Sequence, residues 1–164
     1  RRWRPDPHTT KGAETRPSPG AQVPDYAHAH AALAEGVREI LPPVSPPEPW
    51  FLLLNPRVSL SPADIFSDVE LTRDTPRMTI PDLLSGGGRN DCEPVVCSRY
   101  PEVAAALNWL NEYSPARMTG TGSCVFTAFD SEADAQAVAD RVPEYWDAIV
   151  ARGLNRSPLH TALE

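Results

Sequence analysis

Cysteine is scarce in this sequence, and its pattern excludes the disulfide scaffolds and zinc sites that cysteine usually builds. The 164 residues contain three cysteines, Cys92, Cys97 and Cys124, an odd number that cannot all pair within one chain. Cys92 and Cys97 have no second cysteine pair and no histidine near them, so their spacing does not indicate a zinc site. No targeting signal opens the sequence. We therefore expect reduced thiols, no bound metal and a cytoplasmic protein.

A long apolar run and an excess of basic residues are missing as well. The apolar run Trp50–Leu54 is much too short for a membrane-spanning helix, which needs about 20 residues. The net charge is −7, whereas a protein that binds a nucleic-acid backbone needs a basic face. A small nucleotide stays compatible with this charge, because one pocket of an acidic protein can be locally positive. We expect neither a membrane nor a nucleic acid as partner.

The N-terminal region differs in composition from the rest of the chain. Many of the 19 prolines lie before residue 50, and residues 1–25 are poor in apolar side chains and show no helical or strand period. Such a composition cannot bury enough apolar surface to fold. We predict a disordered or degenerate remnant of an N-terminal domain over 1–25 and a folded domain over 26–164. Since the first residue is Arg1 and not methionine, we expect a fragment or an incomplete reading frame.

Apolar periodicity and capping residues predict the elements of the folded part. The short apolar run 50–56 has a proline at each end and is typical of a buried strand. Val103, Leu107 and Leu110 recur at i, i+4 and i+7 beside Ala106, which predicts an amphipathic helix over 101–113. Helices are expected to begin after Ser61, after Thr79 or Ile80, and after Ser131, the last with Ala133, Ala137 and Val138 on its apolar face. Strand-like pieces are expected on either side of Gly36. A strand, a glycine turn and a second strand are expected over 116–130, and a last strand over 146–154. This order predicts an α+β fold with a small, mostly antiparallel sheet and helices packed on one face.

The stretch RMTGTGSCVF places Gly120 and Gly122 among the small hydroxyl residues Thr121 and Ser123. Successive backbone N–H groups in such a turn can form a concavity that binds an anion. The same glycines suit a plain strand-to-strand turn that needs positive φ. From the residues alone we favour the plain turn. No His or Asp lies near Ser123 in the sequence, so we interpret its hydroxyl as a hydrogen-bond donor and not as a nucleophile.

Several segments together resemble one family. They are ARMTGTGSCVFTAFDSEADAQAV, VARGLNRSPLH, ALAEGVREIL, WFLLLNPRVSLSPADIF, TRDTPR and NDCEPVV. In this order and at this spacing they resemble the C-terminal part of the 4-diphosphocytidyl-2-C-methyl-D-erythritol kinases, which belong to the GHMP kinase superfamily. The resemblance covers roughly residues 20–164 and is therefore far more specific than the glycine motif alone.

The resemblance implies a two-domain kinase of isoprenoid (terpenoid) biosynthesis by the methylerythritol phosphate pathway. Such a kinase transfers the γ-phosphate of ATP, its co-substrate, to the 2-hydroxyl of 4-diphosphocytidyl-2-C-methyl-D-erythritol, together with Mg²⁺. It implies that Phe66 stacks on the cytosine ring and that Gly120, Thr121, Gly122 and Ser123 line the substrate site. The alternative for Phe66 is that it is a core residue, and both interpretations stay open.

The same resemblance implies that no catalytic residue is intact in this chain. The family's catalytic Asp stands in a G-A-D-V-P pattern, which Gly20, Ala21, Val23 and Pro24 match around Gln22. An amide cannot accept the proton of the substrate hydroxyl as a carboxylate does. The family's ATP loop, G-L-G-G-G-S-S, is also absent from the 164 residues. We therefore expect this chain to lack kinase activity as it stands.

The segment NDCE, Asn90 to Glu93, has two interpretations. It packs against the site and holds the glycine turn, or Asn90 or Asp91 caps the helix that follows; we favour the cap. Two other functions stay open for the whole chain. One is a different GHMP kinase, of the homoserine or mevalonate type, and the other is a non-catalytic α+β binding domain or a decayed gene product.

Overall fold

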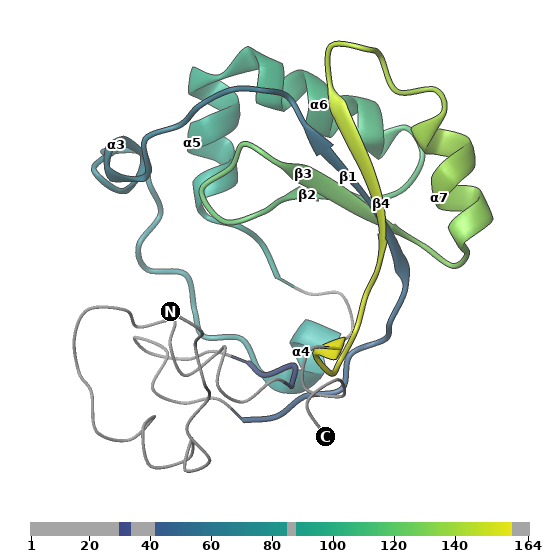
Figure 1. Cartoon of the computed structure of the whole chain (residues 1–164). Helices are drawn as coiled ribbons and strands as arrows, with labels where there is room; N and C mark the ends of the chain where they lie inside the picture. Colours follow the sequence, from purple (N-terminus) through teal and green to yellow (C-terminus); the bar gives the residue numbers. More distant parts are fainter. Residues whose placement is uncertain (1–29, 34–41, 85–87, 159–164) are drawn as a thin grey trace, which may run out of the picture. The chain divides into compact units, whose positions relative to one another are not determined.

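The computed structural model describes residues 30–33, 42–84 and 88–158 of the chain (Figure 1). Its contacts divide the chain into two compact units. One is Glu48–Gly153, and the other combines Arg1–Pro47 with Leu154–Glu164. The predictions for residues 1–25, including the one for Gln22, lie outside the described residues.

The larger unit is built on a four-stranded antiparallel sheet with the strand order β2-β3-β1-β4. The strands are β1 (Trp50–Asn55), β2 (Ala116–Met118), β3 (Val125–Phe129) and β4 (Asp147–Arg152). The helices are α3 (Pro62–Phe66), α4 (Ile80–Leu84), α5 (Cys92–Arg99), α6 (Pro101–Asn111) and α7 (Glu132–Ala139). The predicted strands over 50–56, 116–130 and 146–154 are confirmed, and so is the α+β class.

Strand β1 lies in the middle of the sheet because both of its edges are paired. Leu52 lies opposite Thr127 of β3 on one side and opposite Val150 of β4 on the other. Leu52 and Leu54 are completely buried, as expected for alternate residues that point toward one face of a strand. The apolar run that the sequence places between prolines is therefore the centre of the core.

The helices cover the face of the sheet to which Leu52 and Leu54 point. Helix α6 supplies four buried residues to the same cluster, and these are the residues that its periodicity predicts: Val103, Ala106, Leu107 and Leu110. Helices α5 and α7 add Val95, Val96 and Val138 to the cluster. Burial of several aliphatic side chains, each of which contributes about 1.5–3 kcal/mol, holds helices and sheet together.

Helix α7 begins where predicted but buries a different face. Ser131 is its N-cap and accepts a hydrogen bond from the backbone N–H of Asp134 at 3.1 Å. The buried residues are Ala135 and Val138, whereas the predicted Ala133 and Ala137 are exposed. The prediction of this face was right for Val138 and wrong for Ala133 and Ala137, because alanine stands at every second position from 133 to 139 and such a pattern carries no helical period.

The smaller unit is described by three short segments that bond to one another through their backbones. The N–H of Ala31 donates to the carbonyl of Asn155 at 2.8 Å, and the N–H of Val44 donates to the carbonyl of Ala31 at 3.0 Å. The side-chain amide of Asn155 donates to the carbonyl of Pro46 at 2.8 Å. A strand-like piece therefore lies before Gly36; Gly36 itself and the piece expected after it, up to residue 41, lie outside the described residues.

Candidate functional site

The glycine stretch forms the tight turn between β2 and β3. The N–H of Thr119 donates to the carbonyl of Cys124 at 3.0 Å, and the N–H of Gly122 donates to the carbonyl of Thr119 at 2.9 Å. Gly120 and Gly122 both adopt positive φ, 54° and 88°. The turn interpretation is confirmed, and the backbone conformation explains why glycine stands at these two positions.

Asn90 fixes this turn from the start of α5. Its side-chain amide donates to the carbonyl of Met118 at 3.0 Å and to the carbonyl of Gly120 at 2.7 Å. Its side-chain oxygen accepts from the backbone N–H of Cys92 at 3.0 Å, which satisfies a donor in the first turn of the helix. Both interpretations of Asn90 therefore hold at once, because its two ends serve the helix and the turn.

The neighbours of Asn90 in the NDCE segment make different contacts. The Glu93 carboxylate accepts from the backbone N–H of Met118 at 2.8 Å, so a second residue of α5 holds the end of β2. Asp91 stands at the N-cap position, yet its side chain makes no capping hydrogen bond to the described helix and pairs with Arg89 instead. The hydrogen bond from Asn90 to the N–H of Cys92 joins residues two positions apart, so the sequence could indicate it. The contact of Glu93 with Met118 joins residues 25 positions apart, and no local pattern indicates it.

The turn forms one wall of an open pocket of about 420 Å³. The other lining residues come from the end of β1, the start of α3 and the segment between them. The lining residues are Asn55, Arg57, Val58, Ser59, Leu60, Pro62, Thr121, Gly122, Ser123 and Cys124. The structure thus brings three of the five predicted substrate-binding residues into one pocket with the start of α3, and Gly120 lies beside them in the same turn.

Arg57 also lines this pocket, and sequence reasoning did not single it out. Its guanidinium donates from Nε and Nη2 to one carboxylate oxygen of Asp147, at 3.0 and 2.5 Å. This hydrogen bond and the opposite charges raise the pKa of Arg57 and lower that of Asp147. Asp147 therefore stays ionised to a lower pH than an ordinary carboxyl group. The pair links residues 90 positions apart, so no local pattern could reveal it.

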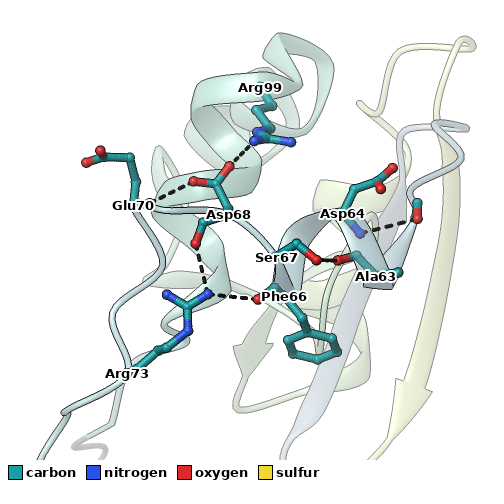
Figure 2. A network of polar contacts seen from close by, with 9 residues as sticks. Ala63, Asp64, Phe66, Ser67, Asp68, Glu70, Arg73 and Arg99 are labelled. Carbon is teal, nitrogen blue, oxygen red and sulfur yellow. Dashed lines mark hydrogen bonds and ion pairs between the residues drawn. The ribbon is translucent and has the colours of Figure 1, made fainter.

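Phe66 is exposed at the end of α3 and does not line this pocket. Phe66 is 58% exposed, so the alternative that it is a core residue was wrong; Ile65 beside it is the buried residue. A hydrogen-bond network holds its backbone, as Figure 2 shows: Arg73 Nη2 donates to the carbonyls of Phe66 and Asp68 at 2.8 and 2.9 Å. The network thus fixes the backbone that carries the exposed ring.

Asp68 connects this network to α5. Its carboxylate is 6% exposed, pairs with Arg99 at the end of α5 and accepts from the backbone N–H of Glu70 at 2.8 Å (Figure 2). A buried carboxylate needs such partners, because an unpaired charge in the interior costs several kcal/mol. A second open depression of about 510 Å³ lies beside this ion pair and is lined by Asp68, Val69, Glu70, Pro94, Val95, Ser98 and Arg99.

The cysteines take no part in a covalent or metal-bound structure. All three lie in described ranges and are free thiols. Burial raises the pKa of Cys92 and Cys97, and the nearby carboxylates of Asp91 and Glu93 add to this effect. Both thiols are therefore protonated at neutral pH. Across the described residues, no three His, Cys, Asp or Glu side chains are grouped as metal ligands, and no helix is both long and apolar enough to cross a membrane.

Comparison with known proteins defines the class of this domain. Residues 77–148 match the family model of the C-terminal domain of GHMP kinases. The match begins before α4 and ends in β4, and it includes both NDCE and the glycine turn. The predicted fold class is thereby confirmed.

One solved structure is similar over most of the chain. It is the crystal structure of a 4-(cytidine 5'-diphospho)-2C-methyl-D-erythritol kinase, with a TM-score of 0.70 and 20% sequence identity. The similarity covers 82% of this chain and 54% of the kinase, so the chain spans about half the length of that enzyme. At this identity the likeness is one of fold.

Replacement of Asn90 by aspartate tests its hold on the glycine turn. Asn90→Asp keeps the acceptor for the N–H of Cys92 but turns a carboxylate toward two carbonyl oxygens. We expect a loss of about 1–3 kcal/mol in the free energy of unfolding, measured by urea denaturation, and faster amide exchange in residues 120–123. The control Asp91→Asn removes only an exposed ion pair and should cost less than about 1 kcal/mol. Equal stability of the two variants would contradict the role of Asn90.

The two glycines of the turn should differ in their tolerance of a side chain. A Cβ on Gly122 would lie 2.6 Å from Leu60 Cδ1 and 3.0 Å from Met118 Sδ, whereas a Cβ on Gly120 would meet no described atom within 4 Å. Gly122→Ala should therefore lower the free energy of unfolding by roughly 2–4 kcal/mol, from overpacking together with backbone strain. Gly120→Ala should cost about 1 kcal/mol, from its positive φ alone. A larger loss for Gly120→Ala in urea denaturation would contradict this packing.

Proposed function

We propose that this chain is the C-terminal part of an ATP-dependent kinase that phosphorylates the 2-hydroxyl of 4-diphosphocytidyl-2-C-methyl-D-erythritol in isoprenoid biosynthesis. The observation that carries the proposal is the clamped glycine turn on the wall of a pocket, within a GHMP kinase C-terminal domain. The fold similarity to a kinase with this substrate, over 82% of the chain, supports the same substrate class. A cytoplasmic location is part of the proposal.

The turn offers hydrogen-bond donors to a ligand. The backbone N–H groups and the hydroxyls of Thr121 and Ser123 have no hydrogen-bond partner among the described residues, and both residues are half-buried. Polar groups in such positions are usually bonded, so free donors facing a pocket suit an incoming acceptor such as a phosphate oxygen. Gly120 contributes differently, because its carbonyl is bonded to Asn90 and only fixes the turn.

Phe66 is proposed to stack on the cytosine ring. An exposed aromatic ring on an ordered backbone suits a flat base, because only the side chain needs ordering when the base binds. The bonds of Arg73 to the carbonyls of Phe66 and Asp68 supply this fixation. This interpretation places the base over α3, beyond the rim of the pocket at Pro62, and the phosphates toward the turn.

The residues that line this pocket do not fit a Mg²⁺ site. Mg²⁺ prefers carboxylate and phosphate oxygens, and the ten residues that line the pocket include no carboxylate. The residue at the family's catalytic position, Gln22, has no carboxylate either and lies outside the described residues.

A second candidate is a GHMP kinase with another small-molecule substrate. The family model describes GHMP kinases in general, and the identity to the solved kinase is 20%. The two candidates differ in one feature, since only the first requires a cytosine site at Phe66. A non-catalytic binding domain is also consistent with Gln22. It differs from both kinase candidates because its pocket would bind a ligand without phosphorylating it.

Binding of cytidine 5'-diphosphate and turnover of ATP test the proposal. We expect cytidine 5'-diphosphate to bind the chain, measured by calorimetry, and Phe66→Ala to weaken it about tenfold, because a stacked base contributes about 1–3 kcal/mol. Tyr145→Ala is the matched control, since Tyr145 is an exposed aromatic with 63% of its side chain accessible. In an ATP-consumption assay with 4-diphosphocytidyl-2-C-methyl-D-erythritol, we expect no turnover because of Gln22.

Three results would contradict these expectations. Turnover by this chain would show that Gln22 does not abolish activity. Equal affinity of the Phe66→Ala and Tyr145→Ala variants for cytidine 5'-diphosphate would contradict a cytosine site at Phe66. Tighter binding of another nucleoside diphosphate than of cytidine 5'-diphosphate would favour the second candidate.

A further inference from the structure

We propose that Arg57 is the specificity-determining residue of this pocket, and that it selects ligands with a phosphate or diphosphate group. In this arrangement the anion lies between the guanidinium of Arg57 and the donors of the glycine turn. The inference deepens the proposed function and rests on it for the location of the ligand. It adds a residue from the opposite wall to the set that the glycine motif supplies.

The charge of the pocket depends on Arg57. Of the ten lining residues, all of which are described, Arg57 is the only one with a charged side chain. The chain as a whole carries −7, so anions are repelled from most of its surface. Because the carboxylate of Asp147 balances this charge, Arg57 would attract a phosphate group through its remaining N–H donors and not through a net positive charge of the pocket.

The guanidinium keeps free donors although it is paired. Nε and Nη2 both donate to the same oxygen of Asp147, and Nη1 has no hydrogen-bond partner among the described residues. Arginine carries five N–H donors in a fixed plane and binds phosphate oxygens in pairs. Asp147 therefore orients the group without using up its capacity for a second anion.

The backbone of Arg57 is strained, which is unusual for a residue with a long side chain. Its φ is +59°, a value that favours glycine, and the side-chain oxygen of Asn55 accepts from its backbone N–H at 2.9 Å. This turn and the pair with Asp147 hold the strained conformation in place. Strained residues of this kind cluster at ligand-binding sites, where the strain presents a side chain that a relaxed backbone would place elsewhere.

The two walls complement each other across the pocket. The segment after β1 contributes Arg57 and Ser59 to the lining, and the turn contributes Thr121 and Ser123, whose N–H groups and hydroxyls have no partner among the described residues. Charge-assisted hydrogen bonds are about twice as strong as neutral ones, so Arg57 should decide affinity while the turn decides orientation. Neutral ligands would gain only the weaker contacts.

Titration with inorganic pyrophosphate tests this role, with amide chemical shifts of Thr121–Cys124 in the full chain as readout. We expect Arg57→Gly to weaken binding about tenfold or more, since a hydrogen bond to a charged group contributes about 1.5–3 kcal/mol and 1.4 kcal/mol is tenfold. Glycine relieves the strain, so this variant should fold. Arg57→Lys should bind with intermediate affinity, because it keeps the charge but loses the planar fork.

Arg152→Ala is the matched control. Arg152 is also a paired surface arginine, with Glu48 at 3.8 Å, and its side chain is 57% exposed against 55% for Arg57. Its removal should change pyrophosphate affinity less than twofold. The proposal is overturned if the wild-type turn shows no pyrophosphate shifts, or if Arg57→Gly and Arg152→Ala bind equally well.

Parallel titrations with cytidine and cytidine 5'-diphosphate separate this proposal from the proposed function. If cytidine 5'-diphosphate binds in a Phe66-dependent manner and Arg57→Gly has no effect, the role of Arg57 is wrong and the cytidine site stands. If pyrophosphate binding depends on Arg57 but the cytidine moiety adds no affinity, Arg57 is confirmed and the cytidine site is wrong.

Discussion

The side chain of Asn90 is the contact on which the candidate site depends. Its amide joins the carbonyls of Met118 and Gly120 to the first turn of α5, so one residue fixes both a helix start and a glycine turn. Glycine turns are flexible unless their backbone groups are held from outside. Because α5 is packed on the sheet through Val95 and Val96, the turn inherits the rigidity of the core.

The site divides its chemistry between two walls that differ in kind. The turn supplies neutral donors whose positions the backbone sets, whereas the segment after β1 supplies one charge whose position a surface ion pair sets. Fixed neutral donors give geometry, and a single cation gives attraction that depends on ionic strength. Phe66 lies outside this pocket on a separately anchored helix end, so the aromatic and the anionic parts of a ligand would be recognised by independent structures.

Sequence reasoning predicted the parts of the fold that local patterns encode. The central strand, the apolar face of α6 and the cap Ser131 follow from periodicity and capping chemistry. The apolar face of α7 was wrong because alternating alanines give no period. The glycine turn was found from its residues, but its clamp by Glu93 and the pair of Arg57 with Asp147 connect residues distant in sequence. Such contacts appear only when the sheet brings the segments together.

The topology of the sheet also constrains how the chain folds during synthesis. Trp50 at the start of β1 pairs with Phe129 of β3 and with Arg152 of β4. Both edges of this apolar strand therefore stay unpaired until β3 and β4 have been synthesised. A strand with two open edges is prone to pair with other chains, and contacts between distant residues form slowly. Helices α3, α5 and α6 emerge before β3 and β4, and all three contribute buried residues to the core cluster of β1, so they can shield this strand while translation continues.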